Sequence, residues 1–180
     1  MPGRLVGRKV VVLLAKGFED LEFWVTVMRL REEGADVTIA GPTTQPVHGK
    51  NGLEARADVE VGTLSADAFE AVVVPGGWAP DALRRSDAVK DLVRGAHDQG
   101  KIVGLICHAG LVGISAGIVS GGRATGSLGI KDDLVNAGAT WVDEPAFRDG
   151  NIVWGRVVDD IPDFCRELVA AIEAGPARTD

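Results

Sequence analysis

The sequence lacks the segments that a membrane protein or a secreted protein needs. Its longest unbroken apolar runs are short, such as residues 10–15, whereas a membrane-spanning helix takes about 20 apolar residues. Residues 1–9 carry charge, but the apolar run that follows them is too short for a signal peptide. We therefore expect a cytoplasmic protein with no membrane partner.

Signatures of metal binding and nucleic-acid binding are missing as well. The chain has two cysteines, Cys107 and Cys165, and neither a CxxC motif nor a Cys/His cluster, so no metal site is expected. Nothing in the sequence favours a disulfide between the two. The 19 basic residues are scattered and outnumbered by 26 acidic ones, which gives a net charge of −7. This charge balance argues against a nucleic-acid partner.

What the sequence does contain is typical of one globular domain. Its 180 residues are 46% hydrophobic and 25% charged, which suffices for an ordinary core and is too apolar for a disordered chain. Glycine is abundant at 24 residues, roughly twice its usual share, and predicts many tight turns. Because no repeat or linker interrupts the chain, we expect a single domain over residues 1–180.

Buried strands and helices are predicted to alternate along the chain. Continuous apolar runs, typical of strands covered on both faces, lie at residues 9–15, 37–40, 71–74 and 102–106. Helical spacing of apolar residues predicts one helix whose buried face is Leu21, Trp24, Val25 and Met28, and further helices at residues 89–96, 111–118, 130–136 and 161–172. Residues 42–65 predict a hairpin or an edge excursion. The alternation predicts an α/β open sandwich with a mainly parallel central sheet and helices on both faces.

The strand-to-helix junction at Cys107 is the strongest candidate for chemistry. It resembles a nucleophile elbow, in which a strained turn presents a nucleophile at the top of the sheet, although Leu105 stands where that motif usually has glycine. An elbow predicts a positive φ at Cys107. The start of a helix predicts a lowered thiol pKa. The alternative is a buried, unreactive cysteine.

A glycine-rich turn follows the strand at residues 71–74. In the turn Pro75-Gly76-Gly77, the absence of side chains would let backbone N–H groups approach a ligand closely. Together with the N–H of His108 they would form an oxyanion hole. The alternative is a turn that only ends a strand.

Three acidic residues follow the strand at residues 9–15. Glu19, Asp20 and Glu22 suit the start of a helix, where acidic side chains interact favourably with the helix dipole. Capping is a sufficient role for Asp20 and Glu22. Glu19 lies at the mouth of the strand, so it is the acid that we expect within hydrogen-bond reach of Cys107, with the two groups sharing one proton.

Four stretches of the chain resemble the ThiJ/PfpI superfamily: residues 17–22 (GFEDLE), 73–80 (VVPGGWAP), 106–110 (ICHAG) and 129–141 (GIKDDLVNAGATW). The resemblance covers about residues 7–174 and is greatest to the PfpI branch of intracellular-protease-like, general stress proteins. It implies a flavodoxin-like fold related to that of class I glutamine amidotransferases.

The resemblance also implies roles for individual residues. Cys107 matches the nucleophile, Glu19 the carboxyl that hydrogen-bonds to it, and His108 the histidine of the PfpI branch. Asp81 matches a glutamate that orients this histidine across a subunit interface, which implies a homodimer or a larger ring. The substrate would lie against Gly76, Gly77 and Trp78 and the N–H of His108.

This chain departs from the family pattern in three places. Asp81 is one methylene shorter than the family's glutamate, and Trp78 stands where the branch often has arginine. Residues 155–158 (GRVV) replace a Ser-Arg-x-Pro segment near the C-terminus.

Three functions need the same activated thiolate and stay open at this point. The first is a cofactor-free hydrolase of the deglycase or glyoxalase type, acting on small aldehydes or glycated, damaged proteins as part of a stress response. The second is an intracellular cysteine peptidase, for which a histidine directly after the nucleophile is awkwardly placed. The third is a redox sensor or chaperone whose Cys107 is oxidised reversibly.

Overall fold

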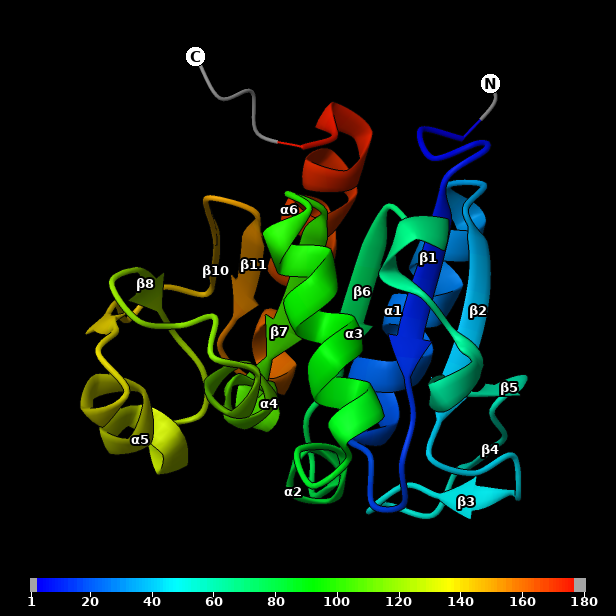
Figure 1. Cartoon of the computed structure of the whole chain (residues 1–180), viewed down its shortest axis with the longest axis horizontal. Coiled ribbons are helices and arrows are strands. Elements are labelled where there is room, and N and C mark those ends of the chain that lie inside the picture. The colour runs from blue at the N-terminus through cyan, green and yellow to red at the C-terminus, as the bar shows by residue number, and fades with distance from the viewer. Residues whose placement is uncertain (1–2, 177–180) are drawn as a thin grey trace.

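Seven strands form the central sheet of the computed structural model, which describes residues 3–176 (Figure 1). The strand order is β10-β11-β7-β6-β1-β2-β5. Every neighbouring pair is parallel except β10 and β11, which form an antiparallel hairpin at one edge. The strands of this sheet are β1 (Lys9–Leu13), β2 (Asp36–Gly41), β5 (Val59–Glu60), β6 (Ala71–Val74), β7 (Ile102–Ile106), β10 (Ala146–Asp149) and β11 (Ile152–Gly155).

Helices cover both faces of the sheet, which confirms the α/β open sandwich (Figure 1). Helices α1 and α6 pack together on one face, whereas α3, α4 and α2 lie on the other. The inner strands β6 and β7 are buried along their whole length, because both of their faces meet helices. The α-helices are α1 (Asp20–Glu32), α2 (Ala79–Leu83), α3 (Asp87–Asp98), α4 (Gly110–Ala116), α5 (Lys131–Asn136) and α6 (Ile161–Ala174). No pattern in the sequence predicted α2.

Short elements surround this core. Strands β3 (Val47–His48) and β4 (Glu54–Ala55) form the antiparallel hairpin expected within residues 42–65. Strands β8 (Arg123–Ala124) and β9 (Thr140–Trp141) pair in parallel outside the main sheet. Single 3₁₀ turns complete the chain: η1 (Val61–Thr63), η2 (Ala66–Ala68), η3 (Cys107–Ala109), η4 (Leu128–Ile130) and η5 (Val158–Asp160).

Helix α1 turns a different face to the core from the one that the sequence predicted. Leu21, Val25 and Met28 were expected to be buried, but they are 48%, 39% and 62% exposed. The buried side of α1 instead carries Asp20, Glu22, Phe23, Thr26, Val27 and Leu30. Phe23, Thr26, Val27 and Leu30 have the same helical spacing as the predicted face, so apolar spacing alone did not distinguish the two. The difference matters for function, because it places Glu22 in the interior, at 0% exposed.

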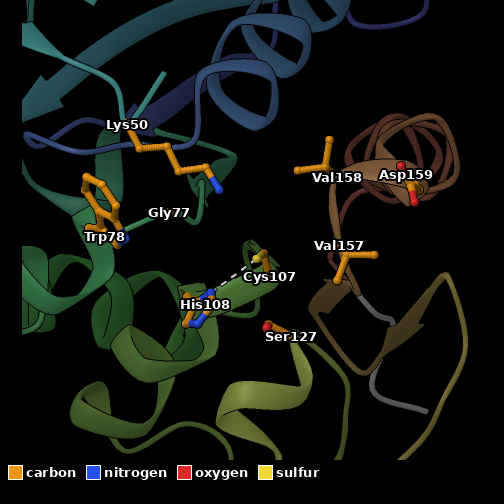
Figure 2. Close-up of a pocket in the computed structure, with 9 residues that line it drawn as sticks. All are labelled: Lys50, Gly77, Trp78, Cys107, His108, Ser127, Val157, Val158 and Asp159. Atoms are coloured by element: carbon orange, nitrogen blue, oxygen red, sulfur yellow. Dashed lines mark hydrogen bonds between the residues drawn. The ribbon is translucent and has the colours of Figure 1, made fainter. Parts of the chain in front are cut away.

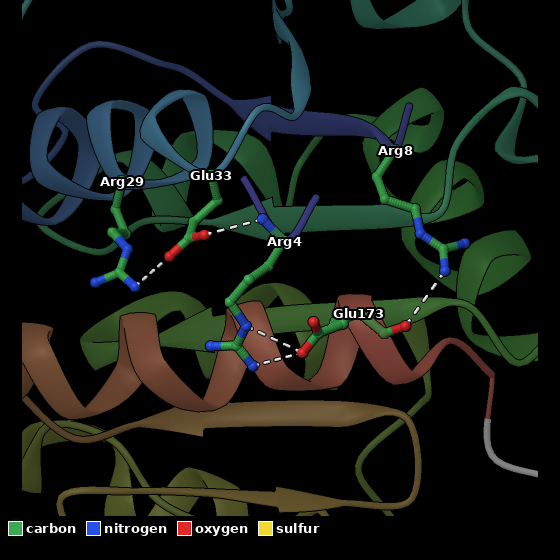
Figure 3. Close-up of polar contacts among 5 residues, drawn as sticks. All are labelled: Arg4, Arg8, Arg29, Glu33 and Glu173. Atoms are coloured by element: carbon green, nitrogen blue, oxygen red, sulfur yellow. Dashed lines mark hydrogen bonds and ion pairs between the residues drawn. The ribbon is translucent and has the colours of Figure 1, made fainter. Parts of the chain in front are cut away.

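Charged contacts fix the start of the chain to the helices behind the sheet (Figure 3). The Arg4 guanidinium donates to the Glu173 carboxylate of α6 from Nε at 3.0 Å and from Nη2 at 2.6 Å. The backbone N–H of Arg4 donates to Glu33 at 3.2 Å, and Arg8 donates to the Glu173 carbonyl. These contacts lie at the amino ends of the parallel strands, opposite the candidate site, and so serve the fold.

Within residues 3–176, no helix is long and apolar enough to cross a membrane. The ends of the predicted domain, residues 1–2 and 177–180, lie outside the described residues.

Candidate active site

The candidate site lies at the carboxyl ends of three neighbouring strands. In the register of the sheet, Val74 of β6 pairs with Leu105 of β7, and Ile106 of β7 pairs with Gly155 of β11. The loops that leave these strands therefore start at the same edge. Together with the turn between β3 and β4 and the segment before η4, they enclose a pocket of about 330 Å³. Its lining is Lys50, Gly77, Trp78, Cys107, His108, Ser127, Val157, Val158 and Asp159 (Figure 2).

Cys107 occupies a nucleophile elbow, as the sequence predicted. It follows the last residue of β7 and begins η3, which leads directly into α4. Its φ is 61°, and it has the one positive φ of a non-glycine residue within residues 3–176. Such a conformation costs of order 1–3 kcal/mol and persists only where the surroundings enforce it. Here Ser127 N–H donates to the Cys107 carbonyl at 3.2 Å, and an added Cβ at Gly126 would lie 2.5 Å from that carbonyl oxygen.

The carboxyl beside Cys107 belongs to Glu22 and not to Glu19. An added Cβ at Gly76 would lie 2.5 Å from Oε2 of Glu22 and 2.8 Å from Cβ of Cys107, and the two side chains shift each other's pKa. Oε2 of Glu22 accepts the N–H of Gly76 at 2.7 Å. The other oxygen, Oε1, is buried and has no nitrogen or oxygen donor within the described residues. Because an unpartnered carboxylate oxygen is costly in the interior, this arrangement favours a protonated Glu22 carboxyl.

Glu19 and Asp20 have other partners, which corrects the assignment made for Glu19. Glu19 is the N-cap of α1, and its Oε2 accepts the N–H of Glu22 at 2.8 Å. Its Oε1 accepts from the side chain of Asn51 at 3.3 Å. Asp20 is 2% exposed and accepts the N–H groups of Asn51 and Leu53. The acid at the helix cap therefore holds a neighbouring loop, while the acid three residues later reaches the thiol.

Burial controls the protonation of the Glu22–Cys107 pair. It raises the pKa of Glu22 to about 7, against the opposing effect of the Gly76 N–H. Burial, and next the negative charge of Glu22, raises the pKa of the Cys107 thiol to about 12, while the N–H groups of His108 and Gly77 lower it. The lowered thiol pKa predicted from the sequence is therefore wrong in direction when Glu22 is ionised. These values describe a coupled pair that keeps one proton between about pH 7 and about pH 12.

This protonation predicts how stability depends on pH. The Glu22 pKa rises from 4.5 in the unfolded chain to about 7 in the folded protein, so the folded protein holds the proton more tightly. The stabilisation is complete below pH 4.5 and is lost as the pH rises through about 7, a change of about 3 kcal/mol. Urea unfolding of wild type and Glu22→Gln at pH 5 and pH 8 should show this loss in wild type alone. An equal loss in both proteins would assign it to another group.

Two backbone amides face the sulfur, and a third does not. The N–H groups of Gly77 and His108 act on the Cys107 sulfur, where they lower the pKa of the thiol, and donors beside a nucleophile are what an oxyanion hole requires. Gly76 was expected to take part, but its N–H already donates to Glu22. An added Cβ at Gly76 would lie 2.5 Å from Oε2 of Glu22 and 2.8 Å from Cβ of Cys107. Gly76 is therefore needed for close packing and does not reach a substrate.

The remaining predicted residues divide between the pocket and its surroundings. His108 lines the pocket with its Nδ1 3.3 Å from the Cys107 sulfur, and burial, followed by the positive charge of Lys50, lowers the pKa of His108. Trp78 also lines the pocket and is 69% exposed. Asp81 does not line it; its exposed carboxylate pairs with Arg85, which follows the end of α2. One chain alone therefore does not bring Asp81 to His108.

Sequence reasoning missed several lining residues, namely Lys50, Ser127 and Asp159. Ser127 caps η4 and donates its N–H to the elbow, and a polar residue just before a helix was a signal for such a cap. Val157 and Val158 fall in the segment where the family pattern is lost. Nothing in the sequence marked Lys50. Within residues 3–176, no group of three His, Cys, Asp or Glu side chains could hold a metal ion.

Comparisons with known proteins identify the family of this chain and support its fold. A family model described as the DJ-1/PfpI family matches residues 8–171. "Deglycase PfpI" of Pyrococcus furiosus is 36% identical over 92% of this chain and 99% of its own length. "Putative cysteine protease YraA" of Bacillus subtilis is 34% identical over 90% of this chain and 96% of its own. The crystal structure of Drosophila melanogaster DJ-1beta has a TM-score of 0.84 at 29% identity, covering 93% of this chain and 94% of that one.

Proposed function

The chain belongs to the DJ-1/PfpI family, and from this premise we propose that it is a cysteine-dependent, cofactor-free hydrolase that acts on reactive carbonyl compounds and glycated proteins. One observation carries the proposal. The strained elbow holds the Cys107 sulfur against a buried carboxyl, Glu22, and against two backbone N–H groups. Relatives named as deglycases support the same activity.

The site has the groups that addition to an aldehyde requires. The Cys107 sulfur forms a bond to the aldehyde carbon, and the electron pair of the C=O π bond moves to the carbonyl oxygen. This oxygen then takes a proton from the Glu22 carboxyl. The N–H groups of Gly77 and His108 stabilise the negative oxygen before the proton arrives. The product is a hemithioacetal, which contains all the atoms of the thiol and the aldehyde, so no group leaves in this step.

A dicarbonyl such as methylglyoxal can then react further without a cofactor. A proton moves from the former aldehyde carbon to the neighbouring carbon, so that one carbon is oxidised while the other is reduced. Neutral His108, 3.3 Å from the sulfur, is the base that accepts this proton. Water then cleaves the thioester and releases lactate and the thiol. From a glycated side chain, the C–N bond of the hemiaminal breaks as its nitrogen takes the hydroxyl proton, which releases the amine and the aldehyde that then adds to the sulfur.

A second candidate function, an intracellular cysteine peptidase, has one observation in its favour. The contact between His108 Nδ1 and the Cys107 sulfur provides an imidazole beside the nucleophile. The name of the Bacillus subtilis relative points the same way. A peptidase must protonate an amine leaving group, and His108 would have to serve both the sulfur and that amine.

Turnover of three substrates by the wild-type protein tests the proposal. We expect lactate from methylglyoxal and free amine from a methylglyoxal-treated peptide, with no cleavage of unfolded casein. Casein cleavage without lactate would favour the peptidase. Absence of all three products, together with peroxide-dependent oxidation of Cys107, would overturn the carbonyl hydrolase and the peptidase and would leave the redox sensor.

The assembly and setting of this enzyme form part of the proposal. We place it in the cytoplasm as a stress-response protein and a homodimer, with Asp81 of one subunit beside His108 of the other. The mass in solution at micromolar concentration tests the dimer, and a strictly monomeric mass would remove Asp81 from the mechanism.

A further inference from the structure

The side chain of Lys50 extends over the pocket with its ammonium group directed towards the space above Cys107 (Figure 2). Glu54, the acidic residue of the same hairpin, pairs with His48, and Lys50 forms no ion pair within residues 3–176. The positive charge of Lys50 nevertheless acts on the site, because it lowers the pKa values of Glu22 and His108. Lys50 is thus an uncompensated cation beside the nucleophile.

The loop that carries Lys50 is held in place by hydrogen bonds to buried groups of the preceding loop and of α1. The N–H of Lys50 donates to the Phe18 carbonyl at 2.9 Å. On its C-terminal side, the N–H groups of Asn51 and Leu53 donate to the two oxygens of Asp20, each at 2.8 Å. Gly49 lies so close that an added Cβ would be 2.6 Å from this carboxylate. Asp20 is therefore a positioning residue that fixes the backbone from which Lys50 reaches the pocket.

The pocket is electrostatically asymmetric. Lys50 lies on one side, and Val157, Val158 and the exposed carboxylate of Asp159 line the other (Figure 2). Between the two rims lie the sulfur and the neutral imidazole of His108. A substrate with a negative group would be attracted to the Lys50 side and repelled from Asp159, which would fix its orientation over Cys107.

We propose that Lys50 makes this pocket selective for reactive carbonyl compounds that carry a carboxylate or phosphate group next to the carbonyl. Selectivity follows from one unpaired charge near the reacting carbon, since a hydrogen bond between an ammonium and an anionic group is stronger than one between neutral groups. This inference rests on the proposed function only in taking Cys107 as the nucleophile.

Alkylation by two matched reagents tests the selectivity without requiring turnover. Iodoacetate and iodoacetamide react alike: a bond forms between the Cys107 sulfur and the methylene carbon, and iodide leaves. They differ mainly in the charge of the group beside that carbon. The ratio of the two rates therefore reports the pocket's preference for an anion and cancels any change in the thiolate fraction.

We expect Lys50→Met to lower the iodoacetate-to-iodoacetamide ratio about tenfold, the effect of one charge-assisted hydrogen bond at a partly exposed site. Lys50→Arg should keep most of the ratio, and Asp159→Asn should raise it. High salt should reduce the wild-type ratio, because it screens an exposed charge. Lys131→Met is the matched control, since it removes the same charge next to Trp141, away from the lining, and should not change the ratio.

The carbonyl itself provides a second measurement. Glyoxylate, which carries a carboxylate, should protect Cys107 from iodoacetamide at lower concentration than methylglyoxal does, through hemithioacetal formation. Lys50→Met should remove this difference. Asp20→Asn should weaken the selectivity as well, without moving the pH at which iodoacetamide begins to react.

The outcomes separate this inference from the function on which it rests. An unchanged ratio in Lys50→Met, with rapid alkylation of Cys107, would overturn the role of Lys50 and leave the nucleophile in place. Alkylation of Cys107 no faster than that of an ordinary thiol by both reagents would overturn the proposed function itself, and the selectivity with it.

Discussion

Cys107→Ser is expected to abolish the turnover of methylglyoxal and of glycated peptides, with a loss of at least about a thousandfold. A serine hydroxyl is far less acidic than a thiol, and Glu22 and two N–H groups cannot ionise it near neutral pH. The substitution replaces sulfur by the smaller oxygen at a half-buried position, so the fold should remain. Lactate release and amine release measure the loss, and circular dichroism checks the fold.

Cys165→Ser is the matched control for this experiment. Cys165 is 4% exposed in α6, and its sulfur lies 3.9 Å from the hydroxyl of Thr26, so serine can make a similar contact there. Activity should be unchanged apart from a small loss of stability. Turnover that survives in Cys107→Ser, or disappears in Cys165→Ser, would contradict the assignment of the nucleophile.

Glu22→Leu is expected to raise the pH at which iodoacetamide alkylates Cys107 by about one unit or more. In the wild-type protein, about half of the molecules keep the Glu22 proton at pH 7, and a protonated carboxyl that donates to the sulfur favours the thiolate. Leucine cannot donate, and the loss of one charge-assisted hydrogen bond corresponds to about one pKa unit. The rate at pH 7 should therefore fall about tenfold.

Two further variants sharpen this test. Glu22→Gln keeps an N–H donor at the same position and should react nearly as fast as wild type. Glu19→Leu removes only the N-cap and the contact to Asn51, so it should lower stability without moving the alkylation profile. A Glu22→Leu protein that reacts faster than wild type at pH 7 would place the shared proton on the sulfur and leave Glu22 as an inhibitory charge.

The sequence predicted the sheet and the elbow because both depend on local patterns. Short apolar runs flanked by glycine are characteristic of buried parallel strands, and β6 and β7 occupy the predicted residues 71–74 and 102–106. The direct passage from such a strand into a helix at Cys107 resembles the nucleophile elbow, and that pattern predicts a positive φ. The φ of 61° at Cys107 confirms this prediction.

The partner of Cys107 could not be predicted in the same way. The apolar residues of α1 fit two helical faces, one beginning at Leu21 and the other at Phe23, and only the packed structure selects between them. Glu22 lies on the flank of either face, and only its contact with the turn at Gly76 places it in the interior. Lys50 was missed for a related reason, because a tertiary contact with Asp20 brings its loop to the pocket.

The distribution of the site along the chain has a consequence for newly made protein. The pocket needs the hairpin at Lys50, the turn at Gly77, the elbow at Cys107 and the segment that follows β11. During synthesis, the last of these emerges long after Cys107. The lining of the pocket is therefore complete only when β11 has paired with β7, so the proposed substrate selectivity is a property of the finished chain.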